Sequence, residues 1–330
     1  MRPRAREWVQ RGVYAPGAVR LSTAMKGVAW GVAAVGVAAP LVRRKLRLRP
    51  PVVAGLAAAA PFAVCVAVPR SRKRDVAVCL LQMWAYLAMY EMPNDDPEAL
   101  ERRVHIRYPV AIDRAIGLGQ LPGVRLQRAL ARRGGLRRMD GVLVAAHWVW
   151  FLVPHATVGY LLLFRRRQFE RGAVMIYAVF DLGVLVYWAL PTAPPWYAAK
   201  EGVIEAREAT EPALRRLMVE QGEAFWREHW EPLFNLLAGN PLAAMPSLHF
   251  ATSAMAAHVL ADAGPVEGAI GWTYALTLGF ALVYLGEHYV VDLLAGYALV
   301  TAVRRLEGPA TPVLRAISRG VRALEARAAG

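Results

Sequence analysis

Cysteine is scarce in this chain of 330 residues, and both cysteines lie in apolar stretches. Cys65 and Cys79 belong to no Cys-x-x-Cys motif. A disulfide framework and a thiolate metal site both need more cysteines at closer spacing. The sequence therefore predicts neither of them.

Acidic residues are also few, with 25 Asp and Glu against 40 Lys and Arg and a formal net charge of +15. A basic excess can indicate nucleic-acid binding, but here the basic residues lie mostly in short clusters between apolar blocks. Positive-inside sorting and anionic lipid headgroups explain that distribution better. We expect a membrane as the partner and no nucleic acid.

Long apolar blocks dominate the sequence, which is 56% hydrophobic with a mean hydropathy of +0.29. A bilayer core of about 30 Å needs about 20 apolar residues per helix. Barrel strands would alternate apolar and polar residues, and these blocks do not. The fold class predicted is an all-α, polytopic transmembrane helix bundle. The expected spans are 24–42, 52–69, 76–92, 141–164, 172–191, 247–262, 268–286 and 290–304.

Basic clusters predict the topology. The loop at 165–171 and the C-terminal tail are rich in arginine, which places both in the cytoplasm together with the N-terminus. Two clusters, at 43–49 and 132–138, fall outside in this topology. Either the first two spans form a shallow hairpin, or these arginines lie at headgroup level. The first apolar block is long, which is typical of a retained helix rather than a cleaved signal.

Two long segments, 93–140 and 192–246, fall between spans on the outer side. The first has the pattern of an amphipathic helix lying on the membrane. The second opens with a proline-rich run at 191–197 that ends the preceding helix. Residues 201–235 are helical in pattern, with Trp226 and Trp230 expected on one face.

Three polar residues stand at the edges of the last three spans. His249 falls in the first turn of a helix with Pro246 expected at its first position, and such a helix start attracts phosphate. His288 and Asp292 are four residues apart, so on a helix they share one side and can hydrogen-bond. An aspartate that holds one imidazole nitrogen makes the other a better nucleophile. Each residue alone is more often structural, but together they predict a site.

The strings Pro-Ser-Leu-His at 246–249 and His-Tyr-Val-Val-Asp at 288–292 closely resemble the last two motifs of the type 2 phosphatidic acid phosphatase superfamily. The runs at 191–197, 243–249 and 292–296 resemble more specifically the branch that contains fungal inositol phosphorylceramide synthase. The resemblance covers about 75–305, including the segment 113–118. It implies a six-helix core, to which the first 70 residues add two helices. We therefore expect an N-terminal extension (1–70), a catalytic transmembrane domain (71–306) and a basic cytoplasmic tail (307–330).

The resemblance implies phosphoryl or phosphodiester transfer through a histidine nucleophile. His288 would attack phosphorus with help from Asp292, forming a phosphohistidine, and His249 would protonate the departing lipid alcohol. The helix start at Ser247 would supply N–H donors to phosphoryl oxygens. The scheme needs no metal and no other cofactor. Its partners would be a phospholipid donor and a lipid alcohol or water.

The sequence departs from the superfamily in its cations. Most members have an arginine six residues before the nucleophilic histidine, where this chain has Leu282, and the usual Lys and Arg-Pro motif is absent. Without these cations, a singly charged phosphodiester is the more natural substrate. Lys200 is a candidate replacement or a solvated loop lysine, and Trp196 is a further substrate-binding candidate. Asn240 either orients substrate or ends the preceding helix.

Other polar residues lie within predicted spans. His147 and His155 are eight residues apart, roughly on one helix face, and either line a headgroup cavity or bond a neighbouring helix. Asp181 is a carboxylate at membrane depth, which suggests function by default, although it could pair with one of these histidines. His258 is expected to be structural.

The leading hypothesis is transfer of a phosphate-linked headgroup, with phosphoinositol suggested by the resemblance, at the outer face of a bacterial plasma membrane. The second is a phosphatase acting on phosphatidic acid or a polyprenyl phosphate or pyrophosphate. A transporter with a His/Asp relay would show paired repeats, and none is evident. An intramembrane serine protease would need a Gly-x-Ser-x-Gly-type turn, which the sequence lacks.

Overall fold

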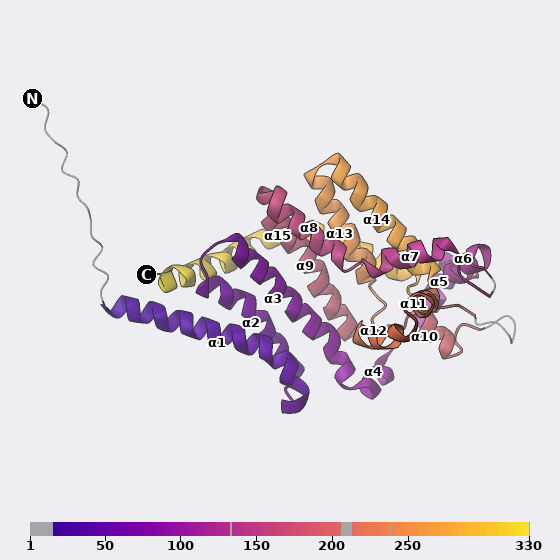
Figure 1. The fold of residues 1–330 in the computed structure, drawn as a ribbon, viewed down its shortest axis with the longest axis horizontal. Coiled ribbons are helices and arrows are strands. Elements are labelled where there is room, and N and C mark those ends of the chain that lie inside the picture. Colours follow the sequence, from indigo (N-terminus) through magenta and orange to yellow (C-terminus); the bar gives the residue numbers. More distant parts are fainter. Residues whose placement is uncertain (1–15, 133, 206–212, 238, 330) are drawn as a thin grey trace, which may run out of the picture. The chain divides into compact units, whose positions relative to one another are not determined.

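The computed structural model describes residues 16–132, 134–205, 213–237 and 239–329. The regular secondary structure of this described part is helical, and its only extended pairing is a set of isolated bridges that join Thr192 to His105 and Ala243. The all-α class predicted from the apolar blocks is confirmed (Figure 1). The chain divides into two compact units, one made of 1–85 and 311–330, the other of 86–310.

The first unit contains α1 (Pro16–Leu46), α2 (Pro50–Ala67), the start of α3 (Arg72–Glu91) and the end of α15 (Val290–Ala329). Helices α1 and α2 pack closely because small residues line their contact, and a Cβ on Gly36 would meet the Leu56 carbonyl. Arg74 donates to Glu325 at 2.7 Å and to the carbonyls of Cys65 and Val68, which fastens the end of α15 to α2 and α3.

The second unit carries the remaining elements. They are η1 (Met92–Asp95), α4 (Pro97–Arg103), α5 (Arg107–Ile116), α6 (Pro122–Leu130), α7 (Arg138–Trp148), α8 (Leu152–Phe164), α9 (Arg166–Ala189), α10 (Pro195–Lys200), α11 (Leu217–Trp226), η2 (Arg227–His229), α12 (Trp230–Leu237), α13 (Leu248–Ala263) and α14 (Pro265–Tyr284), followed by the first part of α15. Helix α13 is central and packs against α8, α9 and α14 (Figure 1). Its buried face is rich in alanine, which allows the neighbouring helices to approach closely.

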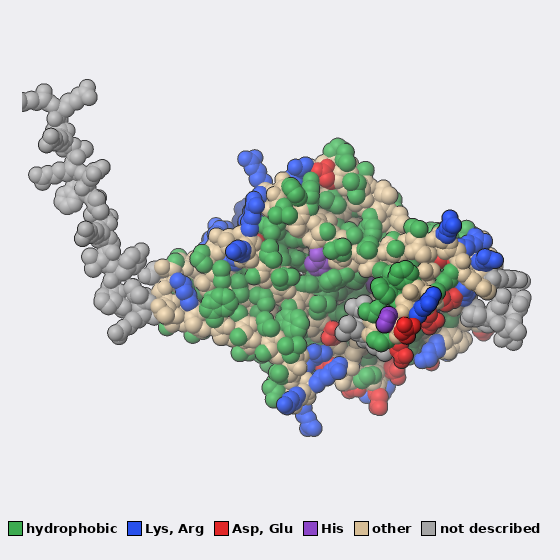
Figure 2. Space-filling view, viewed as in Figure 1, with side chains coloured by type: hydrophobic (Ala, Val, Ile, Leu, Met, Phe, Trp, Pro, Cys, Tyr) green, Lys and Arg blue, Asp and Glu red, His purple; other side chains and the backbone are tan. Residues whose placement is uncertain are grey.

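Within the described residues, four unbroken helices are long and apolar enough to cross a membrane: Ser22–Leu46 of α1, and α2, α9 and α14. Helices α7 and α8 pass the same test as a pair, bent by 54°. The helix predicted over 141–164 is thus interrupted between Trp148 and Leu152, and the crossing of the membrane by this bent pair stays a prediction. Figure 2 shows hydrophobic side chains over the long helices of each unit and Lys and Arg side chains around the short helix α6.

The predicted spans at 76–92, 247–262 and 290–304 fall in α3, α13 and α15, which do not meet that criterion by themselves. Helix α13 has only 16 residues, and α3 starts with three basic residues and an aspartate. The assignment of these three helices to the membrane stays a prediction. Helix α15 runs unbroken through residue 307, where the tail was expected to begin.

The two segments between spans differ in detail from their predicted structure. The stretch 93–140 forms separate short helices rather than one amphipathic helix. In 201–235, residues 206–212 lie outside the described part, and the helix that begins at Leu217 breaks at Arg227, which has a φ of +51°. Trp226 and Trp230 thus lie on separate helices, although each ring centroid is 6.1 Å from that of Trp148.

Candidate active site

The two motif histidines and the aspartate form one hydrogen-bonded chain. Nδ1 of His249 lies 3.2 Å from Nε2 of His288, and Nδ1 of His288 lies 3.1 Å from Oδ2 of Asp292. Asp292 is fully buried and His288 nearly so. With an ionised Asp292 accepting the Nδ1 proton of His288, Nε2 carries the lone pair unless the ring is protonated. The arrangement thus directs Nε2 of His288 towards His249.

The helix that carries His249 is tied directly to the helix that carries Asp292. Ser247 caps α13 by accepting from the Phe250 N–H at 3.3 Å, and its own N–H donates to the Asp292 carbonyl at 3.0 Å. Pro246 therefore precedes the cap, and its predicted place at the first helical position is wrong. Because the Ser247 hydroxyl is buried and engaged in the cap, its position favours a structural part over contact with substrate.

Two carboxylates hold the first turn of α15. Asp292 also accepts from the Tyr289 N–H at 2.9 Å, and Asp113 on α5 accepts from the Val291 N–H at 3.0 Å. Burial raises the pKa of Asp113 to about 6, so its carboxyl is mostly ionised at neutral pH. A negative charge at this helix N-terminus is favourable. Asp113 was part of the sequence resemblance but had not been recognised as a site residue.

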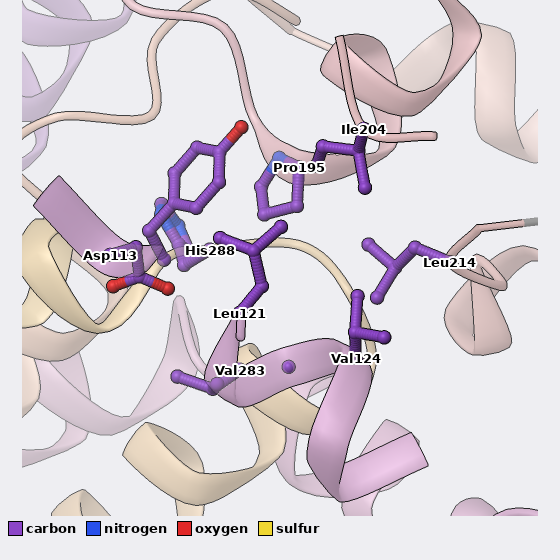
Figure 3. A pocket seen from close by; sticks show the side chains of 10 residues that line it. Asp113, Leu121, Val124, Pro195, Ile204, Leu214, Val283 and His288 are labelled. Atoms are coloured by element: carbon purple, nitrogen blue, oxygen red, sulfur yellow. The ribbon is translucent and has the colours of Figure 1, made fainter. Parts of the chain in front are cut away.

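One side of His288 faces a small pocket lined mainly by apolar side chains from α6, α10 and the loop before α11 (Figure 3). Asp113 lies at the edge of this pocket beside His288 (Figure 3). Apolar surroundings strengthen the electrostatic interactions of buried groups.

The structure brings His147, but not His155, into ring contact with His249. The rings of His147 and His249 stack with centroids 5.0 Å apart, and the Trp150 ring lies 4.1 Å from His249. The ring of His155 instead contacts those of Phe151, Tyr177 and Phe180. The expectation of a shared face was wrong because it assumed an unbroken helix.

The remaining sequence candidates have other surroundings. Asn240 is buried, and its side-chain oxygen accepts from the Leu242 N–H at 3.1 Å, which supports the alternative of a turn-forming role. Lys200 is exposed, with its ammonium 5.9 Å from the Tyr197 ring centroid. Asp181 is half-buried on α9 and lies within electrostatic range of Tyr86.

Sequence reasoning missed an ion pair next to the nucleophile candidate. Arg216 donates to both carboxylate oxygens of Glu287, at 2.9 and 3.1 Å, and Glu287 directly precedes His288. The Arg216 guanidinium lies 4.1 Å from the centroid of the Trp196 ring. In the sequence, only the position of Glu287 next to His288 indicates a charged partner at the site. No residue close to Arg216 in the sequence marks it as that partner.

Gly286 allows this pairing, which leads to a stability prediction. Its φ is +83°, and a Cβ there would lie 2.9 Å from the Arg215 carbonyl oxygen. We expect Gly286→Ala to lower the free energy of unfolding by about 1 to 3 kcal/mol and to reduce turnover. Thermal unfolding in detergent measures the first effect.

Gly308→Ala on α15 is the matched control, since a Cβ there meets nothing within 4 Å. Alanine is favoured over glycine inside a helix, so this control should unfold at the same or a higher temperature. Equal unfolding temperatures of Gly286→Ala and Gly308→Ala would contradict the close approach of Gly286 to Arg215.

The helical fold and the buried, hydrogen-bonded polar residues at the N-terminal ends of α13 and α15 define a multi-pass integral membrane protein with an enzyme-like site. The PAP2 superfamily model matches residues 110–306, more than half of the chain, and the chain belongs to that superfamily. It is therefore an enzyme, a phosphatase or phosphotransferase of lipid phosphates. No curated protein and no solved structure matches it.

Proposed function

We propose that this enzyme transfers a phosphate-linked headgroup from a phospholipid to a lipid alcohol through a phosphohistidine on His288. Phosphoinositol is the headgroup that its motif resemblance to the inositol phosphorylceramide synthase branch favours. The observation that carries the proposal is the hydrogen-bonded chain from Asp292 through His288 to His249. It combines a nucleophile, a group that fixes its tautomer, and a neighbouring acid.

In the first half-reaction, Nε2 of His288 attacks phosphorus, forming the N–P bond while the bond from phosphorus to the lipid alkoxide breaks. His249 gives its proton to the leaving alkoxide. In the second half-reaction, His249 takes the proton of the acceptor alcohol, whose oxygen attacks phosphorus as the N–P bond breaks. Every proton and bond is then accounted for, and both imidazoles return to their initial states.

The geometry requires one movement before this chemistry. The two imidazole nitrogens are 3.2 Å apart, which leaves no room for a phosphorus atom between them. An in-line displacement places phosphorus between nucleophile and acid. We infer that the His249 ring moves aside when the phosphate group enters, which requires it to leave its contacts with His147 and Trp150.

The alternative within the same superfamily is a phosphatase, with water as the acceptor. It would act on a doubly charged phosphomonoester, which needs more positive charge than a diester. Leu282, at the position where most members have an arginine, is fully buried on α14. This apolar replacement favours a diester substrate.

We place the site at the outer face of a bacterial plasma membrane, with both termini in the cytoplasm. The arginine-rich loop at 165–171 and the basic tail support this orientation. We keep the division into an N-terminal extension (1–70), a catalytic domain (71–306) and a tail (307–330) as part of the same proposal.

Phosphorus NMR on mixed micelles tests the function. The purified enzyme is given phosphatidylinositol and a diacylglycerol or ceramide acceptor, with phosphatidic acid in a parallel sample. A new phosphodiester signal that is missing with His288→Ala supports headgroup transfer. Free phosphate from phosphatidic acid, without a new diester, would favour the phosphatase instead.

Asp292→Asn should have a milder effect than loss of either histidine. Asparagine keeps an oxygen that can accept from Tyr289, but its amide cannot hold the His288 tautomer as a carboxylate does. We expect kcat to fall about 10²-fold with an unchanged unfolding temperature. A fall as large as that of His288→Ala would contradict a purely supporting role.

A further inference from the structure

We propose that the Arg216–Glu287 ion pair is the phosphate-binding element of this enzyme and that it selects a singly charged phosphodiester over a doubly charged monoester. The proposal rests on the proposed function and names the substrate class of the same site. Arg216, from a different part of the chain, would bind the phosphate in place of the cations that most superfamily members have.

The pair has the geometry of a strong interaction. Nε and Nη2 of Arg216 each donate to one oxygen of Glu287, and such bidentate pairing is specific for carboxylates and phosphates. The guanidinium also lies over the rings of Trp196 and Phe234, with centroids 4.1 and 5.3 Å away. Stacking of this kind fixes the plane of the guanidinium. Trp196, a sequence candidate for substrate binding, thus acts by orienting Arg216.

The backbone around Arg216 is fixed to the elements of the site. Gln127, buried on α6, donates to the carbonyls of Arg215 and Tyr284 at 2.8 Å each and accepts from the Arg215 N–H at 2.9 Å. Gly286 packs under the same Arg215 carbonyl. Arg216 and Glu287 are therefore held together before any ligand binds, which reduces the entropy lost on binding.

Both partners lie close to the reacting groups. Glu287 is the neighbour of His288 in the chain, and His147 is within electrostatic range of Arg216, Glu287 and His288. His147 in turn stacks on His249. Glu287 thus places the ion pair one residue from the proposed nucleophile.

The charge of the pair explains the selectivity. Arg216 offers N–H groups beyond the two that bind Glu287, and these can donate to an anionic phosphoryl oxygen. Its positive charge is already balanced by Glu287, which has only 10% of its side chain exposed. A phosphodiester brings one negative charge, whereas a doubly ionised monoester brings two and meets the nearby carboxylate. The pair therefore binds a diester and disfavours the dianion.

Binding measured without turnover tests this selectivity. The full chain carrying His288→Ala is titrated in detergent at about pH 8, where a phosphomonoester is doubly ionised. The probes are dihexanoyl phosphatidylinositol and dihexanoyl phosphatidic acid, followed by calorimetry. In this background, Glu287→Gln should raise the affinity for phosphatidic acid about tenfold, because only the dianion is repelled. The affinity for phosphatidylinositol should change by no more than about twofold.

The double substitution separates phosphate binding from a structural role. Arg216→Gln should lower the affinity for both probes about tenfold. The double variant, Arg216→Gln with Glu287→Gln, should bind both probes as weakly as Arg216→Gln alone. If Arg216 served only to neutralise buried Glu287, the double variant would regain the affinity of the unsubstituted pair, which would overturn the proposal. An equal effect of Glu287→Gln on both probes would also overturn it.

Arg128→Gln is the matched control, since it removes one positive charge from an exposed position on α6. It should leave both affinities unchanged. Because the titration does not depend on catalysis, it can succeed even if the enzyme proves to be a phosphatase. The hypothesis of diester selectivity and the hypothesis of headgroup transfer can therefore be refuted separately.

Discussion

We expect His288→Ala to abolish turnover, with kcat at least about 10³-fold lower, because the variant has no nitrogen to form the covalent intermediate. The residual rate would come only from binding and orientation of the substrate. Phosphorus NMR of product formation measures the loss. Rapid quenching in base, where phosphohistidine survives, should trap labelled phosphorus on the wild-type chain and not on the variant.

His229→Ala is the matched control, since this histidine is 75% exposed in its side chain and lies on η2. It should retain wild-type turnover. Activity of His288→Ala at one tenth of the wild-type level would rule out His288 as the nucleophile. A trapped phosphohistidine in that variant would move the nucleophile to another histidine, with His249 the nearest alternative.

Much of this site follows from local sequence spacing. The separation of His288 and Asp292 predicts their contact, and a helix start just before His249 predicts that its ring lies at the same end of the bundle. Both are short-range rules, and the structure shows the corresponding distances. Their catalytic roles stay predictions, since proximity alone does not show chemistry.

The break between Trp148 and Leu152 was not predictable from hydropathy, because the residues around it are apolar and the stretch looks like one span. Pro154 was the available signal, since proline has no N–H to bond the Trp150 carbonyl and is tolerated in the first turn of α8. The break nevertheless sets which histidine reaches the site, because it places His147 against His249 and the ring of Trp150 beside it. The helix break is therefore a local effect of Pro154, which the apolar pattern of the stretch conceals.

Arg216 was missed for a related reason. It lies 71 residues before Glu287, and its position depends on side-chain bonds from Gln127 and on the close approach of Gly286. No periodic pattern joins these residues. Lys200 directly follows the proline-rich run, which makes it a candidate by sequence, but in the fold it is exposed and its ammonium lies over the Tyr197 ring.

We expect His249→Ala to lower turnover of natural lipids about 10²- to 10⁴-fold, the usual contribution of a positioned proton donor. The lipid alkoxide is a poor leaving group, so its departure needs the proton that His249 supplies. A nitrophenyl phosphodiester has a leaving group that departs without protonation. The loss in the first, single-turnover release of nitrophenol should therefore be at least tenfold smaller, because that phase precedes the second half-reaction, in which His249 acts as a base.

The difference between the two substrates is what identifies the acid. His249 also stacks on His147 and touches His288, so its removal could misplace the nucleophile and slow every substrate equally. His147→Ala supplies the comparison, because it removes the stacking partner and leaves the proposed acid in place. Should the leaving-group dependence appear in His147→Ala rather than in His249→Ala, the proton donor would be His147. An equal loss on both substrates in His249→Ala would show that His249 only positions His288.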